Sequence, residues 1–219
     1  MSEQEVENER QLATQRKLLS DGIDQLGLSL SNDAIDRLLQ YVALLDRWNR
    51  AYNLTAIRDR QQMITHHLLD SLAIAGFVQG PRVLDMATGP GLPGIPLAIA
   101  LPEIAFVLLD SNGKKTRFLV QAKSELGLAN VEVVHSRVEA YQPGTEFDTI
   151  TARAFATLET MLVRSRHLCA ANGRYLLMKG RMPQDELGAV PEDFTVQETV
   201  ALQVPGVDGK RHLIIITPR

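Results

Sequence analysis

The chain has 219 residues, of which 45% are hydrophobic and 22% charged, a composition typical of a globular protein that buries a sizeable core. Its formal net charge of −3 argues against a freely scanning nucleic-acid binder, because such proteins are usually basic. One cysteine, Cys169, excludes a disulfide framework, and the apolar runs all fall short of the ~20 residues of a membrane span, so we expect a cytoplasmic protein without membrane contact.

The first 80 residues predict helices. Between residues 33 and 49 apolar side chains recur at steps of three and four, which is typical of an amphipathic helix. A second helix is expected over 63–78 and a weaker one over 11–26. We therefore expect residues 1–80 to form an N-terminal helical extension.

From Pro81 onward short apolar runs alternate with helical segments. The expected strands are 82–85, 104–110, 131–135, 147–152 and 174–179, and the expected helices are 94–101, 114–126 and 158–169. Such alternation indicates βαβ units and a parallel sheet. Two late runs, 194–204 and 212–217, are joined by a short turn and should form an antiparallel hairpin at one sheet edge. Residues 81–219 are thus expected to form one α/β domain with a Rossmann-like sheet.

The charges are distributed unevenly along the chain. Residues 1–110 carry 9 Lys and Arg against 14 Asp and Glu, residues 111–182 carry 11 against 6, and residues 183–219 carry 3 against 6. The positive middle segment can face phosphates, and a solvated helix surface explains it equally well.

The stretch "DMATGPGLPGIPLAIA", residues 85–100, contains the spacing G-x-G-x-x-G of dinucleotide-binding turns. A pyrophosphate on such a turn is held by backbone N–H groups at a helix N-terminus, and Pro90 and Pro93 offer none. Asp85 ends the preceding strand, where it would repel a pyrophosphate and attract the ammonium and sulfonium groups of S-adenosylmethionine. The turn therefore favours a cationic ligand.

Asp110 ends the next strand, where a carboxylate can accept hydrogen bonds from both hydroxyls of a ribose. A helix N-cap is the alternative role for this residue. Together with Asp85 and the glycine turn, Asp110 favours a class I S-adenosylmethionine-dependent methyltransferase over a dinucleotide-binding oxidoreductase.

Class I methyltransferases carry acceptor chemistry after the fourth strand, which here reads "FDTITARAFA" from Phe147. The stretch lacks the Asn/Asp-Pro-Pro-aromatic signature of exocyclic-amine acceptors, and Cys169 lacks the preceding proline of a cysteine that attacks cytosine C6. An acceptor with a free lone pair at neutral pH, such as guanine N7, needs neither group. Proximity and orientation would then supply most of the catalysis.

Seven short motifs between about residues 30 and 217 are specific in combination. They are Asn53-Leu54-Thr55-Ala56, His67-Leu68-Leu69-Asp70-Ser71, Asp85 with Thr88-Gly89-Pro90-Gly91-Leu92-Pro93-Gly94-Ile95-Pro96, Leu108-Leu109-Asp110-Ser111, Ser136-Arg137-Val138-Glu139, Arg153-Ala154-Phe155-Ala156 and Lys179-Gly180. Together they resemble the bacterial small-subunit rRNA guanine-N7 methyltransferases, the glucose-inhibited division protein B family.

The resemblance implies methylation of guanine N7 near position 527, in the 530 loop of 16S rRNA, with S-adenosylmethionine as donor. The cofactor-binding residues that it implies are, besides Asp85, Gly89, Gly91 and Leu92 at the methionine end, Asp110 at the ribose, Val138 and Glu139 at the adenine, and Arg153 where cofactor and acceptor meet. Arg153 is also the expected catalytic residue, which positions the reactants without acting as a general base.

We expect RNA contacts from Asn53, His67 and Lys179, although Lys179 can equally cap a sheet edge. Two residues depart from the family pattern. Ala87 stands where glycine is usual, so the turn must avoid a positive φ there or accept strain. His66 stands where arginine is usual, which predicts a weaker and pH-dependent RNA contact.

We expect no bound metal, because His66, His67 and Asp70 lack a further ligand at suitable spacing. A small-molecule methyltransferase, a redox enzyme and a non-catalytic binding module remain alternative functions. A small-molecule enzyme would need a lid over the acceptor, which the N-terminal helices could supply. The modest charge favours the small ribosomal subunit or its precursor over naked rRNA as substrate, and we expect a monomer.

Overall fold

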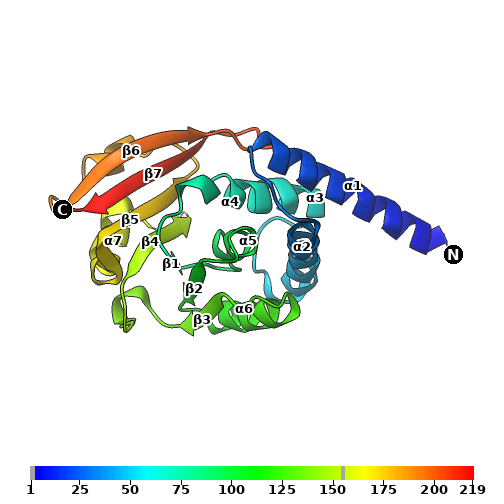
Figure 1. Ribbon diagram of the computed structural model, residues 1–219, viewed down its shortest axis with the longest axis horizontal. Coiled ribbons are helices and arrows are strands. Elements are labelled where there is room, and N and C mark those ends of the chain that lie inside the picture. Colours follow the sequence, from blue (N-terminus) through cyan, green and yellow to red (C-terminus); the bar gives the residue numbers. More distant parts are fainter. Residues whose placement is uncertain (1–2, 154–155) are drawn as a thin grey trace.

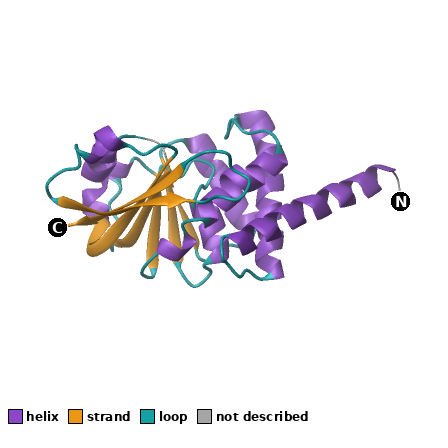
Figure 2. Cartoon of the chain, turned by 90° about the horizontal axis from the view of Figure 1, so that it is seen from above, coloured by secondary structure: helices purple, strands orange, loops and turns teal. Residues whose placement is uncertain are grey.

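The computed structural model of the chain describes residues 3–153 and 156–219. A seven-stranded sheet in the order β3-β2-β1-β4-β5-β7-β6 forms its centre, and helices pack on both of its faces (Figures 1 and 2). The strands are β1 (Arg82–Met86), β2 (Ala105–Asp110), β3 (Val131–His135), β4 (Phe147–Arg153), β5 (Cys169–Lys179), β6 (Phe194–Leu202) and β7 (Arg211–Pro218). Strands β1 to β5 are parallel, and β7 runs antiparallel to both β5 and β6, which confirms the predicted sheet and its edge hairpin.

The helices are mostly those that the sequence predicts. Their bounds are α1 (Glu3–Gln25), α2 (Asn32–Tyr52), α3 (Arg60–Met63), α4 (Asp70–Leu72), α5 (Gly94–Ala100), α6 (Gly113–Glu125), α7 (Leu158–Ser165) and α8 (Gln184–Leu187), with a π-helical segment η1 (Ile64–Leu69) and 3₁₀ turns η2 (Ala75–Phe77), η3 (Val138–Ala140) and η4 (Arg166–Leu168). Ser31 caps α2, since its side chain accepts the N–H of Ala34.

Two separate hydrophobic cores follow from the alternation of side chains along the strands. Val83 and Leu108 point to the face that packs against the N-terminal helices, α5 and α6. Leu84 and Leu109, one residue on, point to the opposite face and pack with α7. The carboxyl ends of β1, β2 and β4 are therefore held between two rigid layers, where an open α/β sheet binds its ligands.

Three details differ from the sequence-based prediction. The helix expected over 63–78 is divided into α3, η1, α4 and η2, because apolar periodicity does not distinguish a π-helical turn from an α-helical one. The helix expected over 158–169 ends as α7 at Ser165, and Cys169 already pairs with Phe147 in the sheet. The short helix α8 was missed, because four residues carry no periodic signal.

The N-terminal helices share a core with the sheet domain. Leu38 and Leu45 of α2 belong to the same buried cluster as Leu97 of α5 and Phe118 of α6. Only α1 extends beyond the body, with its N-terminal end at the tip (Figure 1). The division of the chain at residue 80 stays a prediction.

None of the helices in the described residues is both long and apolar enough to cross a bilayer.

Candidate active site

The glycine turn after β1 has an unusual backbone. Ala87, Gly89 and Gly91 have φ values of 53°, 62° and 99°, all in the left-handed region. Glycine adopts this region without cost, whereas alanine does so at roughly 1–2 kcal/mol. The turn therefore accepts strain at Ala87, which is one of the two outcomes expected for this residue.

The glycines of the turn have different roles. A Cβ at Gly91 would lie 2.5 Å from Cδ1 of Ile95, and one at Gly94 would lie 2.2 Å from Cδ2 of Leu108. Neighbouring side chains therefore leave no room for a side chain at either position. A Cβ at Gly89 would meet only Nζ of Lys115, at 3.9 Å. Gly89 is thus the glycine of this turn over which a ligand can approach the backbone.

Asp85 lies beneath the turn and is fully buried. Its carboxylate accepts hydrogen bonds from the N–H of Gly94 at 2.8 Å, from the hydroxyl of Thr151 at 3.1 Å and from the hydroxyl of Thr88. Desolvation outweighs these bonds and raises the pKa of Asp85 to about 6. In this geometry Asp85 holds β1, the turn and α5 together.

Asp110 joins the turn to the end of β2. One carboxylate oxygen accepts the N–H of Gly89 at 2.9 Å, and the other accepts the N–H of Asn112 at 2.8 Å. Asn112, and not Asp110, caps α6. Each carboxylate oxygen has a second lone pair, so Asp110 retains capacity for two ribose hydroxyls.

A hollow of about 350 Å³ opens beside Asp110 at the carboxyl ends of β2 and β3. It is lined by Ala87, Leu109, Asp110, Ser111, Ser136, Arg137, Val138, Glu139 and Arg164. The buried carboxylate of Asp110 can accept hydrogen bonds from hydroxyls, and the apolar side chain of Val138 can contact a base. Both features fit the nucleoside part of S-adenosylmethionine. The backbone at Gly89 leaves room for the ligand beside them. We call this the cofactor hollow.

The predicted cofactor residues fall into two groups. Asp110, Val138 and Glu139 line the cofactor hollow, with Gly89 hydrogen-bonded to Asp110. Other predicted residues are buried under the turn, namely Asp85, Gly91 and Leu92. Ser111 and Ser136 belong to the quoted motifs without a predicted role, and they line the hollow as well. Both directly follow strand ends, a position that in itself signals a ligand site.

A second hollow, of about 400 Å³, lies at the same edge of the sheet. Its lining consists of Thr55, Ala56, Ile57, His66, His67, Asp70, Arg153, Met178, Lys179, Gly180, Leu202, Arg211 and His212. The register of β1 with β4 pairs Asp85 with Thr151, so Arg153, two residues further on, is level with Ala87 of the turn. We call this second site the acceptor hollow.

Two arginines meet one buried carboxylate in the acceptor hollow. Asp70 accepts Nε of Arg211 at 3.0 Å and Nη1 of Arg153 at 3.5 Å, and Arg153 also donates to the backbone oxygen of His66 at 3.2 Å. That oxygen belongs to the π-helical segment η1, a backbone form often found at functional sites. These contacts hold the Arg153 guanidinium at the carboxyl end of β4.

His67 is buried, and both of its ring nitrogens are engaged within the chain. Nε2 lies 2.9 Å from the hydroxyl of Thr55, and Nδ1 lies 3.1 Å from the backbone oxygen of His66. Desolvation and the positive charge of Arg153 lower the pKa of His67 to about 4. The imidazole is therefore neutral at physiological pH, and its contact with RNA stays a prediction.

The other predicted RNA-binding residues lie in different settings. Lys179 lines the acceptor hollow, and its ammonium group donates to Glu186 at 2.9 Å and to the backbone oxygen of Ala156 at 2.9 Å. Asn53 is the C-cap of α2, with φ 49°, and lies outside the lining of that hollow. Within the motif that begins at Arg153, residues 154 and 155 lie outside the described residues.

Over the described residues, no three His, Cys, Asp or Glu side chains are arranged to hold a metal ion.

The strand order, the glycine turn and the carboxylate at the end of β2 are those of the class I S-adenosylmethionine-dependent methyltransferase fold. The family model of GidB, rRNA small subunit methyltransferase G, matches residues 34–214. The chain belongs to this family.

Relatives with the name ribosomal RNA small subunit methyltransferase G support this result. The chain is 55% identical over 197 residues to that of Stutzerimonas stutzeri, covering 89% of this chain and 92% of the relative. It is 52% identical over 202 residues to that of Nitrosococcus oceani, covering 92% and 94%.

Solved structures show the same fold at low sequence identity. A glycopeptide N-methyltransferase in complex with S-adenosylmethionine matches with a TM-score of 0.61 and 10% identity, over 70% of this chain and 87% of that one. A SAM-dependent methyltransferase from Aquifex aeolicus matches with a TM-score of 0.55 and 18% identity, over 71% and 92%.

Proposed function

We propose that this protein transfers a methyl group from S-adenosylmethionine to N7 of a guanine in 16S rRNA, near position 527 in the 530 loop. The family is one of small-subunit rRNA methyltransferases, and the curated relatives carry the same name. A dinucleotide-dependent oxidoreductase does not fit this family. The observation that carries the choice of atom is the state of the ionisable groups in the acceptor hollow.

Two of those groups are poorly suited to remove a proton from an acceptor. Both oxygens of Asp70 are paired with arginines, and both nitrogens of His67 are hydrogen-bonded within the chain. His66 is partly engaged as well, since Nδ1 lies 2.8 Å from the hydroxyl of Thr65. His212 also lines the hollow, and its buried Nδ1 has no hydrogen-bond partner among the described residues. The engaged state of Asp70 and His67 supports an acceptor that already has a free lone pair, and guanine N7 is such an atom.

The chemical step then needs no proton transfer. When bound, S-adenosylmethionine supplies a methyl group made electrophilic by the sulfonium. The N7 lone pair forms the new bond to carbon as the bond to sulfur breaks, and the positive charge passes to the base. Arg153 would orient the base through its planar guanidinium, which Asp70 and the His66 oxygen hold in place. Proximity and orientation supply the rate enhancement.

Within this proposal Asp110 binds the ribose, Val138 and Glu139 contact the adenine, and Gly89 lies at the methionine end. Asp85, Gly91 and Leu92 also belong to the cofactor site in this proposal. Gly91 and Leu92 shape the turn at its methionine end, and Asp85 holds the turn through Gly94 and Thr88. The substrate would be the small subunit or its precursor, because a chain of net charge −3 gains little from nonspecific phosphate attraction. The enzyme would act as a monomer.

The test uses small ribosomal subunits that lack the modification and S-adenosylmethionine with a tritiated methyl group. We expect label in one guanine, at which reduction with borohydride followed by aniline cleaves the strand, a reaction specific for N7-methylguanosine. Subunits with adenine at that position are the control and should stay unlabelled. Label in an exocyclic amine, or efficient methylation of a small molecule instead of RNA, would contradict the proposal.

The pH dependence gives an independent check. Single-turnover rates at saturating subunit and cofactor should be nearly flat between about pH 6.5 and 8.5, because no proton leaves in the step. A tenfold rise in the single-turnover rate per pH unit would show that the acceptor must first lose a proton.

A further inference from the structure

A group of arginines lies where the N-terminal helices meet α6. The first 110 residues carry 9 Lys and Arg, and four of these, Arg47, Arg50, Arg58 and Arg60, fall within 14 consecutive residues. The surrounding segment is acidic overall, so this concentration of positive charge is local. We call these four residues the arginine surface.

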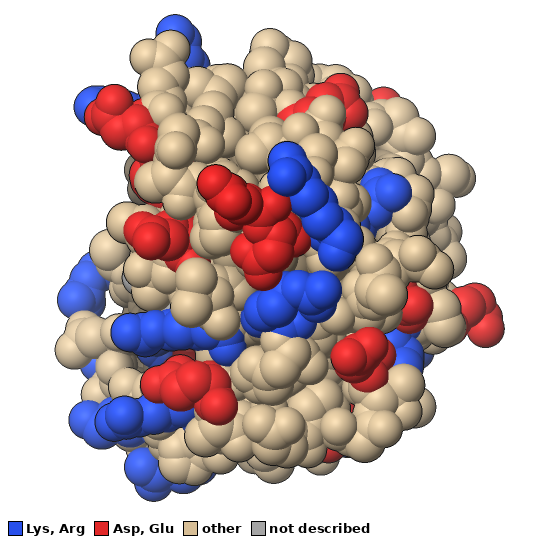
Figure 3. All heavy atoms as spheres, turned by 90° about the vertical axis from the view of Figure 1, so that its left-hand side faces the viewer, with Lys and Arg blue, Asp and Glu red and all other residues tan. Residues whose placement is uncertain are grey.

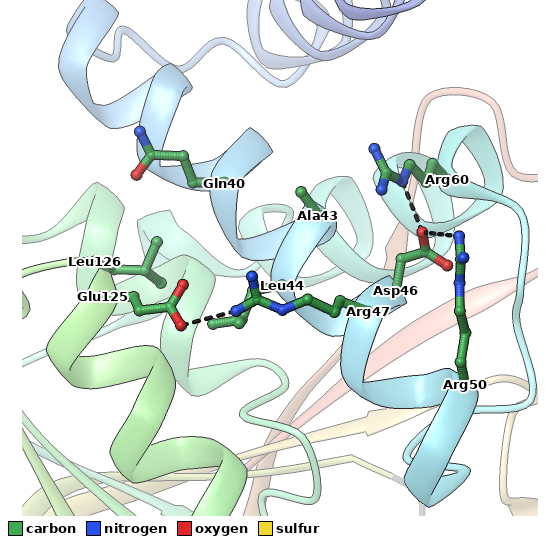
Figure 4. A pocket seen from close by; sticks show the side chains of 9 residues that line it. All are labelled: Gln40, Ala43, Leu44, Asp46, Arg47, Arg50, Arg60, Glu125 and Leu126. Atoms are coloured by element: carbon green, nitrogen blue, oxygen red, sulfur yellow. Dashed lines mark hydrogen bonds and ion pairs between the residues drawn. The ribbon is translucent and has the colours of Figure 1, made fainter. Parts of the chain in front are cut away.

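The helical geometry brings three of the four side chains to one hollow. Arg47 and Arg50 are three residues apart on α2 and share a face, and Arg60 begins α3. They line a hollow of about 480 Å³ together with Gln40, Ala43, Leu44, Asp46, Glu125 and Leu126. Figure 4 shows Arg50 and Arg60 converging on Asp46, while Arg47 reaches Glu125 of α6.

The carboxylates position these guanidinium groups without using all of their donors. Asp46 is 8% exposed, and one of its oxygens accepts Nε of Arg60 at 2.9 Å and Nη2 of Arg50 at 3.2 Å. Arg47 donates to Glu125 at 2.8 Å. A guanidinium has five N–H donors, so most donors of these three residues have no partner among the described residues.

Arg58 adds a further charge directly after the loop residues that line the acceptor hollow. It is exposed, and its hydrogen bond in the structure goes to the neutral side chain of Asn53, at 3.3 Å. Its neighbours Thr55, Ala56 and Ile57 line the acceptor hollow, whereas Arg58 lines an adjoining hollow with Arg50 and Arg60. One loop therefore joins the acceptor hollow to the arginine surface.

We propose that the arginine surface binds the phosphate backbone of the rRNA strand that flanks the target base. Planar guanidinium groups fit phosphate oxygens with paired hydrogen bonds, and contacts of this kind fix register without reading sequence. The face at the other end of the molecule, turned to the viewer in Figure 3, carries both basic and acidic side chains. This inference rests on the proposed function, because it assumes an RNA substrate.

The test compares two triple variants with the same change in charge. The first is Arg47→Gln, Arg50→Gln and Arg58→Gln, which keeps Arg60 on the buried Asp46. The matched control is Arg10→Gln, Arg37→Gln and Arg219→Gln, which removes one arginine within α1, one within α2 and one directly after β7. Both are assayed for turnover on unmodified small subunits and for binding to a naked 16S rRNA fragment, and S-adenosylmethionine affinity verifies the fold.

For the first variant we expect KM for the subunit to rise on the order of tenfold or more, with kcat and cofactor affinity unchanged. The slope of log(kcat/KM) against log[salt] should become shallower by about 2, because each phosphate contact to a single strand contributes about 0.7. The control should match the unaltered protein in both measurements.

Three outcomes would overturn the proposal. An equal loss in the control would assign the effect to net charge, and an unchanged salt slope would exclude phosphate contacts. A loss on subunits without a loss on the naked rRNA fragment would assign the arginine surface to a protein partner. Failure of the unaltered protein to methylate the subunits refutes the proposed function instead, so the two failures are distinguishable.

Discussion

Replacement of Asp85 by asparagine should change the pH dependence of stability by a calculable amount. Asp85 is fully buried, and its pKa of about 6 lies above the ordinary value of 3.8. Between these values the folded protein keeps a proton that the unfolded chain has released, so the free energy of unfolding falls as the pH rises. At about 1.36 kcal/mol per pKa unit, the loss reaches about 3 kcal/mol above pH 6.

Asparagine never ionises, so the Asp85→Asn variant escapes this loss. Its oxygen can accept the N–H of Gly94, and its amide can donate to Thr151, so the local hydrogen bonds are largely kept. Relative to the unaltered protein, the variant should therefore gain about 2.5 kcal/mol between pH 4 and pH 7.5. His67, whose pKa is lowered to about 4, contributes a slope of the opposite sign, which cancels in this difference.

Urea unfolding at half-unit steps of pH measures the difference directly. A difference that stays constant with pH would show that burial does not raise the pKa of Asp85. A difference that falls with pH would show that the folded protein prefers the carboxylate. The hydrogen bonds to Asp85 would then outweigh the desolvation of its carboxylate.

Three further predictions concern the two hollows. Ala87→Gly should stabilise the protein by up to about 1 kcal/mol, since relief of roughly 1–2 kcal/mol of strain exceeds the added entropy of the unfolded chain, and urea unfolding without any gain would contradict this. Asp110→Asn should weaken S-adenosylmethionine binding by roughly 1.5–3 kcal/mol in calorimetric titration, and an unchanged affinity would restrict Asp110 to holding the turn. Arg153→Ala should lower turnover on subunits by about 100-fold while costing about 1 kcal/mol of stability, because Asp70 keeps Arg211. A thermal shift as large as that of a core truncation, with turnover retained, would make Arg153 structural.

The sequence predicts the sheet well because its signals are local. Continuous apolar runs mark the buried parallel strands, and the short turn between the last two runs marks the hairpin. The cofactor hollow is predictable for the same reason. Asp110 is the last residue of β2 and Val138 lies three residues beyond the end of β3, and parallel strands end at one edge of the sheet.

The acceptor hollow is harder to predict because its contacts are distant in sequence. Asp70 and Arg211 are 141 residues apart, and they meet only because β7 lies beside β5 rather than at the outer edge. The π-helical segment that presents the His66 oxygen to Arg153 has no periodic signature either. Asp70 belonged to a recognised motif, but its partners come from strands on the far half of the sheet.

A tyrosine of the N-terminal helices also reaches the glycine turn. Tyr41 of α2 is fully buried, and its hydroxyl donates to the backbone oxygen of Pro90 at 2.9 Å. A ligand seated on that turn therefore stabilises α2 through this bond, and the helix cannot detach without disturbing the ligand. Titration with S-adenosylmethionine should raise the melting temperature of the helices and the sheet together, as one cooperative transition, with no early loss of helical signal.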